Sequence, residues 1–147
     1  MKTVLIVEDT DDDVFFLRRA MKEADINNPL QIVTDGQQAI DYLDGKGVYA
    51  DREKYPLPFL VLLDLKLPYV MGLDVLKWIR QRPQFEKMLV VILTSSQQDS
   101  DIEATYRLGG NFFLIKPPNR TKLLELVKNL GNSWNPFNTR PERPKYE

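Results

Sequence analysis

The sequence predicts an α/β protein with a doubly wound, five-stranded parallel sheet. Five short runs rich in Val, Ile, Leu and Phe alternate with five segments whose apolar residues recur at helical spacing. Unbroken apolar runs are typical of strands buried on both faces, and such strands need helices on both sides of the sheet. With 147 residues, the chain is long enough for one domain with its own core.

The first half of the chain contains two strand–helix pairs and a long connection. Residues 4–7 form a β-rich apolar run, and residues 10–24 combine polar helix-start residues with apolar positions at helical spacing. Residues 30–33 are the second strand, and a turn signal precedes a short helix over residues 39–43. Residues 45–58 contain two glycines and two prolines, which indicate a loop.

The second half continues the alternation. Residues 59–63 are the most hydrophobic run of the chain and predict the third strand. A helix is expected over residues 72–82, where Pro83 stops it. Residues 89–93 predict the fourth strand, and residues 99–108 predict a helix with a thin apolar stripe.

The chain ends in a fifth strand–helix pair and a tail. Residues 112–115 predict the strand, and the buried stripe of residues 123–130 predicts the helix, which Gly131 ends. We therefore expect the domain to span residues 1–131. The proline-containing segment 132–147 is expected to be a tail that docks its aromatic residues or is partly disordered.

Composition excludes several classes of site. The formal net charge of −1 argues against a nucleic-acid module that relies on a basic field. The chain has neither cysteine nor histidine, so disulfides, thiolate nucleophiles, zinc sites built on these residues and histidine triads are excluded. Any metal must be held by oxygen, as Mg²⁺ or Ca²⁺ is. The apolar N-terminal run is too short for a signal peptide or a membrane span, which indicates a cytoplasmic protein.

Polar residues follow four of the predicted strands. Glu8 and Asp9 follow the first, Asp64 the third, Thr94 the fourth and Lys116 the fifth. Ligands bind to such sheets at the carboxyl ends of the strands, so these side chains are expected at one edge.

This set of residues fits phosphoryl transfer. Packed carboxylates repel one another, and a cation such as Mg²⁺ relieves that repulsion. One of the carboxylates would then be the nucleophile. Lys116 would pair with a carboxylate or with a phosphoryl group placed on it, and Thr94 would donate a hydrogen bond to that phosphoryl group.

The motifs IVEDT, LLDLKLPYVMG, VVILTSS and FFLIKPP give the chain a family resemblance. Over residues 2–131 it resembles the receiver domains of two-component response regulators, and in particular stand-alone, phytochrome-associated response regulators. The resemblance implies a (βα)5 flavodoxin-like fold with strand order 2-1-3-4-5.

The resemblance also implies roles for individual residues. Asp64 would accept a phosphoryl group from a phosphohistidine of a kinase. Asp9 would bind Mg²⁺ directly, Glu8 through a water molecule, and Lys66 through its backbone carbonyl. Thr94 would move toward the phosphoryl group after transfer.

Three more residues match the family pattern, and two neighbouring positions can be compared with it. Phe113 would change rotamer with the switch, Lys116 would contact the phosphoryl oxygens, and the peptide bond from Lys116 to Pro117 is expected to be cis. Pro118 stands where the family often has an aromatic residue. Ser95 stands where a small residue controls access to the site.

The implied partners are proteins. They are a sensor histidine kinase, such as one of the phytochrome type, or a phosphotransfer protein, together with a downstream target. We expect no direct DNA binding and no membrane. A second copy of the chain, bound as a homodimer through the face formed by residues 99–131, is a further candidate partner. The chain would be no enzyme beyond its own Mg²⁺-dependent phosphorylation and dephosphorylation.

Alternatives remain at the level of sequence. Asp11, Asp12 and Asp13 are interpreted first as helix-start charges, with tuning of the metal site as the second interpretation. A pseudo-receiver would bind partners without phosphotransfer. A phosphatase of the haloacid-dehalogenase type would need a second aspartate two residues after Asp64, where this chain has Lys66.

Overall fold

A computed structural model describes residues 2–130 of the chain. Its strands form one parallel sheet in the order β2-β1-β3-β4-β5, which confirms the expected fold class. The strands are β1 (Val4–Val7), β2 (Leu30–Val33), β3 (Leu60–Asp64), β4 (Leu89–Thr94) and β5 (Phe112–Ile115).

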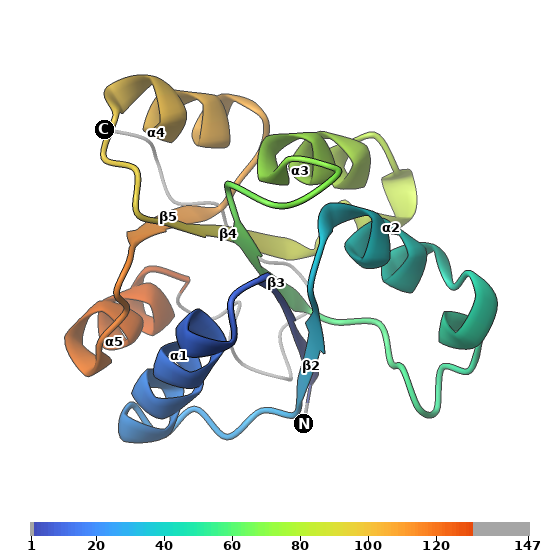
Figure 1. Cartoon of the computed structure of the whole chain (residues 1–147), viewed down its shortest axis with the longest axis horizontal. Helices are drawn as coiled ribbons and strands as arrows, with labels where there is room; N and C mark the ends of the chain where they lie inside the picture. Colours follow the sequence, from blue (N-terminus) through green and yellow to red (C-terminus); the bar gives the residue numbers. More distant parts are fainter. Residues whose placement is uncertain (1, 131–147) are drawn as a thin grey trace.

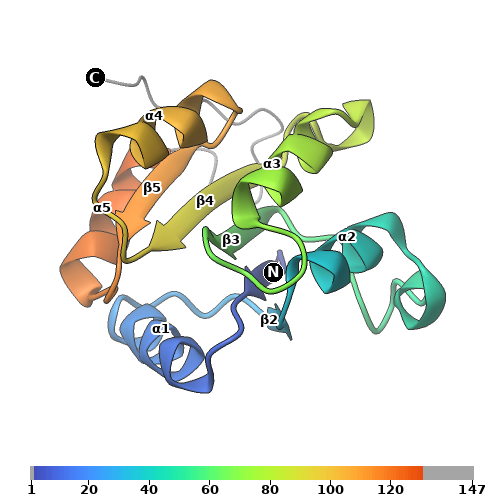
Figure 2. The same ribbon diagram turned by 45° about the horizontal axis from the view of Figure 1, so that its top comes forward.

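Helices cover both faces of the sheet (Figures 1 and 2). The helices α1 (Asp11–Glu23) and α5 (Arg120–Leu130) lie on one face. The helices α2 (Gly36–Asp44), α3 (Gly72–Arg80) and α4 (Asp99–Arg107) lie on the other. The sheet is therefore the middle of three layers, as a doubly wound fold requires.

The alternation of side chains along each strand supplies two separate cores. In β1, Val4 and Ile6 pack on the side of α1 and α5, whereas Leu5 and Val7 pack on the side of α2 and α3. The helices are anchored unequally: α3 buries Gly72, Val75, Leu76 and Ile79, but α4 buries only Ala104 and Thr105.

Element boundaries differ from the expected ones in a few places. The helix expected to reach residue 82 ends at Arg80, because Arg82 precedes Pro83 and takes an extended conformation with φ −110° and ψ 115°. Pro83 instead opens a short 3₁₀ helix, η2 (Pro83–Phe85). The strands β3 and β4 each run one residue further than expected, so Asp64 and Thr94 are their last residues.

The connection expected to be a loop over residues 45–58 has its own packing. It contains the 3₁₀ helix η1 (Gly47–Ala50) and contributes Tyr49 and Tyr55 to a cluster with Tyr42. Arg52 ties the cluster to α2 by donating hydrogen bonds to the backbone oxygens of Tyr42, Leu43 and Tyr55. The glycines and prolines predicted a break in regular structure, but aromatic packing orders this segment.

Two expectations fall outside the described part of the chain. They are the helix end at Gly131, with the domain boundary there, and the tail over residues 132–147. Within residues 2–130, no helix combines the length and the apolar character that crossing a membrane would need.

Candidate functional site

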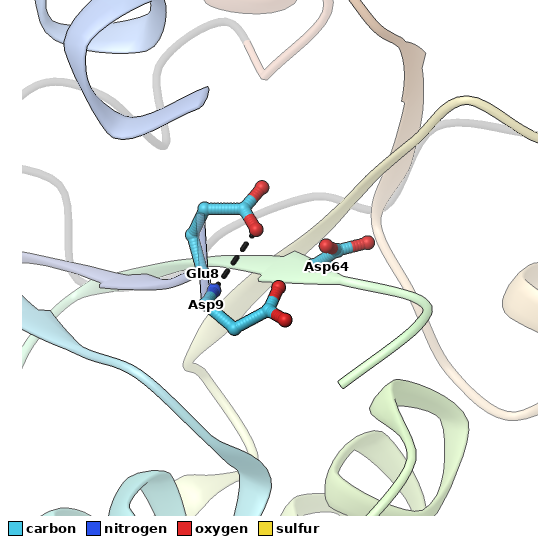
Figure 3. A group of neighbouring side chains, drawn as sticks. All are labelled: Glu8, Asp9 and Asp64. Atoms are coloured by element: carbon cyan, nitrogen blue, oxygen red, sulfur yellow. Dashed lines mark hydrogen bonds between the residues drawn. The ribbon is translucent and has the colours of Figure 1, made fainter. Parts of the chain in front are cut away.

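Three carboxylates meet at the carboxyl edge of the sheet. Glu8 and Asp9 follow β1, and Asp64 ends the neighbouring strand β3. Each offers an oxygen within 4.8 Å of the others, and Figure 3 shows the three side chains gathered at this edge. The structure thus brings together the three acids that were expected at this edge because each follows or ends a predicted strand.

Burial and local hydrogen bonds orient these acids. Glu8 is 2% exposed and Asp64 is 7% exposed, whereas Asp9 is open to solvent. The backbone N–H of Asp9 donates to Oε2 of Glu8 at 2.9 Å, the dashed line of Figure 3. The backbone N–H of Lys66 donates to Oδ1 of Asp64 at 3.1 Å. Each of the two buried carboxylates is therefore held by a neighbouring peptide group.

Lys116 places a positive charge among these carboxylates. Its Nζ contacts a carboxylate oxygen of Glu8, lies 3.1 Å from Oδ2 of Asp64 and lies 3.0 Å from Oδ2 of Asp13. The lysine comes from the segment after β5, so its ammonium reaches past the end of β4 to Asp64 on β3 and to Glu8 after β1. Buried carboxylates at the end of an apolar strand are thereby paired, as their burial requires.

The surroundings shift the pKa values of two of these groups. Burial raises the pKa of Glu8 to about 7, although the hydrogen bond from Lys116 acts in the opposite direction. Burial alone would lower the pKa of Lys116, but the hydrogen bonds to Glu8 and Asp13 and the charge of Asp64 raise it above its ordinary value. The lysine therefore remains charged, and Glu8 takes up a proton more readily than an ordinary glutamate does.

Thr94 and Lys116 are linked through the backbone. The N–H of Lys116 donates to the backbone oxygen of Thr94 at 2.7 Å. The Thr94 side chain is buried, and its hydroxyl oxygen accepts a hydrogen bond from the N–H of Ser96 at 3.2 Å. The Lys116–Pro117 peptide bond is cis.

Other residues singled out in the sequence lie around this edge. Phe113 is half-buried and packs against the core on the side of α2 and α3. Ser95 and Pro117 are exposed, and Pro118 is half-buried. The side chain of Lys66 is exposed, so its backbone is the part that lies at the site. Their functional roles stay predictions.

Asp13 is the site residue that the sequence interpretation ranked too low. Its first interpretation was a helix-start charge, yet its carboxylate contacts the lysine of the site. A signal was present: Asp13 lies four residues before Leu17, which is buried, so both share the face of α1 that turns toward the sheet. Asp11 and Asp12 are exposed, as helix-start charges are expected to be.

The donor set fits a hard divalent cation. Carboxylate oxygens are the ligands that Mg²⁺ and Mn²⁺ accept, and the described acids supply three of them within reach of one ion. The open side of the cluster, where Asp9 is exposed, leaves room for water or a phosphoryl oxygen.

Known proteins resemble the chain over most of its length. The family model described as "Response regulator receiver domain" matches residues 4–128. The response regulator Rcp1 of Synechocystis sp. is 36% identical over 133 residues, which are 90% of this chain and 88% of Rcp1.

Solved structures agree with this match. The bacteriophytochrome response regulator RtBRR is 38% identical, with a TM-score of 0.82, over 96% of this chain and 84% of that chain. The Mn²⁺-bound form of Rcp1 is 35% identical, with a TM-score of 0.75, over 97% and 100%. The phosphorylated cyanobacterial phytochrome response regulator RcpA is 32% identical, with a TM-score of 0.77, over 96% and 99%. The resemblance to phytochrome-associated response regulators is thus confirmed.

Proposed function

Because the chain belongs to the response regulator receiver domain family, we propose that it accepts a phosphoryl group on Asp64 from a sensor histidine kinase. The observation that carries the proposal is the position of Asp64. It is the last residue of β3, it lies beside Glu8 and Asp9, and it contacts the ammonium of Lys116.

The proposed reaction moves one phosphoryl group between two side chains. A carboxylate oxygen of Asp64 attacks the phosphorus of a phosphohistidine, and an O–P bond forms. The P–N bond breaks in line, and its electron pair returns to the imidazole nitrogen of the donor. The product is an aspartyl phosphate on this chain and a free histidine on the kinase or phosphotransfer protein.

The neighbouring residues divide the remaining work. The carboxylates of Glu8 and Asp9 and the backbone carbonyl of Lys66 would hold the metal ion. When bound there, Mg²⁺ neutralises charge on the carboxylates and on the phosphoryl oxygens. Lys116 donates hydrogen bonds to the phosphoryl group, as does Thr94 once its hydroxyl turns toward it.

We propose that the output is a change in protein contacts. Movement of Thr94 would shift the segment before α4 and change the rotamer of Phe113 on β5. The affected face, residues 99–131, would then bind a downstream protein or a second copy of the chain. The proposal places the receiver, residues 1–131, in the cytoplasm together with its kinase, with no reaction of its own beyond gain and loss of the phosphoryl group.

The relatives support this assignment. The structure of RcpA is that of a phosphorylated phytochrome response regulator, and that of Rcp1 contains Mn²⁺. A kinase of the phytochrome type is therefore the donor that we propose.

The test is intact mass after incubation with acetyl phosphate, with and without Mg²⁺. Wild type should gain one phosphoryl adduct that requires Mg²⁺, and Asp64→Asn should gain none. Asp74→Asn is the matched control, because Asp74 is an exposed aspartate in the first turn of α3. A wild type that forms no adduct and binds no beryllofluoride, a phosphoryl mimic, would instead be a pseudo-receiver.

A further inference from the structure

Each of the three N–H groups of the Lys116 ammonium can be assigned to one carboxylate. Among residues 2–130, the ammonium contacts the carboxylates of Glu8, Asp64 and Asp13. A phosphoryl group on Asp64 can gain a hydrogen bond from this lysine only if one of the existing bonds is given up.

The three partners differ in how much their release costs. The side chains of Glu8 and Asp64 are 3% and 8% exposed, whereas that of Asp13 is 38% exposed. Glu8 is buried and would be left with an uncompensated charge, and Asp64 is itself the residue that carries the phosphoryl group, whereas water can replace the lysine at the more exposed Asp13. The bond to Asp13 is therefore the cheapest to break.

Asp13 also differs from the other two in its origin. Glu8 and Asp64 come from strand ends, where the site is built, while Asp13 lies in the first turn of α1. Its contact with Lys116 links that helix turn to the segment after β5, 103 residues along the chain.

We propose that Asp13 is a positioning residue that holds the third N–H of Lys116 until a phosphoryl group takes it. The proposal rests on the function proposed above. Asp13 competes with the phosphoryl oxygens for one donor, so it lowers the affinity of the site for the phosphoryl group. Release of the contact also frees the first turn of α1 from the lysine.

The experiment is a calorimetric titration with beryllofluoride at saturating Mg²⁺. The variants are Asp13→Asn and Asp13→Ala, of which the second removes the acceptor altogether. Matched controls are Asp12→Asn and Asp12→Ala, because Asp12 is an exposed aspartate in the same helix turn. They remove the same formal charge and the same interaction with the helix dipole. A separate Mg²⁺ titration of each variant fixes the saturating concentration.

The Asp13 variants should bind beryllofluoride about two- to fivefold more tightly than wild type, with Asp13→Ala at least equal to Asp13→Asn. The Asp12 variants should stay within about 1.5-fold, since an exposed charge further from the lysine is largely screened. Asp13→Glu, which restores a carboxylate, should return toward the wild-type affinity. If Asp13 served stability alone, its substitution would change the unfolding temperature but not the affinity for beryllofluoride relative to wild type.

Two results would overturn the inference and leave the proposed function intact. Equal tightening in the Asp12 and Asp13 variants would assign the effect to net charge. Weaker binding in the Asp13 variants would mean that Asp13 supports the lysine in its productive position. If wild type binds no beryllofluoride and forms no adduct, the proposed function fails and the inference fails with it.

Discussion

A half-buried cation lies at each edge of the sheet, and the partners described for the two cations are of different kinds. At the carboxyl edge, Lys116 contacts three carboxylates. At the amino edge, the guanidinium of Arg80 donates to the side-chain oxygen of Asn111 and to backbone oxygens. Those backbone oxygens belong to Phe85, Met88 and Gly109.

The kind of partner decides how easily the hydrogen bonds of each cation can be exchanged. Carboxylates carry charge that another cation can neutralise, so a metal or a phosphoryl group can redistribute the bonds of Lys116. Neutral carbonyl oxygens give Arg80 directional bonds and carry no net charge that a second cation could neutralise. Asn111 fixes the arrangement further, since its Oδ1 also accepts from the N–H of Val90 at 2.8 Å. We therefore expect the amino edge to contribute stability and the carboxyl edge to exchange partners.

Arg80→Ala should cause the largest loss of stability. It removes the four hydrogen bonds that the half-buried guanidinium donates to Gly109, Phe85, Met88 and Asn111, which should lower the free energy of unfolding by about 3–4 kcal/mol. Urea unfolding measures the loss, and Mg²⁺ should not reduce it. Arg82→Ala is the control: Arg82 lies 3.8 Å above the ring of Trp78 and should cost about 1 kcal/mol. Equal losses in both variants would contradict the assignment of a structural role to the Arg80 bonds.

Lys116→Met should cost about 2–3 kcal/mol without metal, because Glu8 and Asp64 lose their counter-ion. Mg²⁺ should recover most of this loss, while the phosphoryl adduct should not form. Urea unfolding with and without Mg²⁺ tests the prediction. The control is Lys122→Met, since Lys122 donates to the backbone oxygens of Ile115 and Pro117 at the same edge. Its smaller loss should be independent of Mg²⁺.

Gly72→Ala should disturb the carboxyl edge through the backbone. A Cβ at Gly72 would lie 2.1 Å from the backbone oxygen of Asp64, so the strand end must move. We expect a loss of about 2 kcal/mol and slower phosphorylation by acetyl phosphate. Gly47→Ala is the contrasting variant, because nothing lies within 4 Å of a Cβ there and only its φ of +61° opposes the change. An unchanged phosphorylation rate in Gly72→Ala would contradict the prediction.

Tyr42→Phe should have the smallest effect, at about 1 kcal/mol, by removing the hydrogen bond to the backbone oxygen of Pro56 at 2.7 Å. Burial raises the pKa of Tyr42 to about 12. A raised pKa in the folded state means that its contribution is complete below about pH 10 and is lost toward about pH 12. Urea unfolding across that window should show a flatter decline for Tyr42→Phe. Tyr69→Phe, at a 90% exposed position, should decline like wild type.

Sequence reasoning found the carboxyl edge more completely than the amino edge. Glu8, Asp64 and Lys116 each stand directly after or at the end of an apolar run, and parallel strands bring such positions together whatever the loops do. Asp13 was ranked too low because an acid in the first turn of a helix is usually a dipole charge, although its spacing of four from Leu17 places it on the inner face of α1. Arg80 and Asn111 are 31 residues apart, and no spacing pattern joins the end of one helix to the start of a strand.

The segment between α2 and β3 also depends on tertiary contacts that no sequence pattern reveals. Glycine and proline predicted a loop over residues 45–58, and they did break the helix and strand patterns there. The packing of Tyr49 and Tyr55 on Tyr42 is a tertiary contact with no periodic signal. Its order could be recognised only once the three rings were placed in space.

Because α4 buries few residues, we expect it to open locally more often than α3 does. Local opening of a helix costs roughly what its buried contacts contribute, and α4 buries only two residues where α3 buries four. Amide hydrogens of α4 should therefore exchange with deuterium well before those of α3, even though both helices cover the same face. We therefore expect α4 to open locally while the sheet beneath it stays closed.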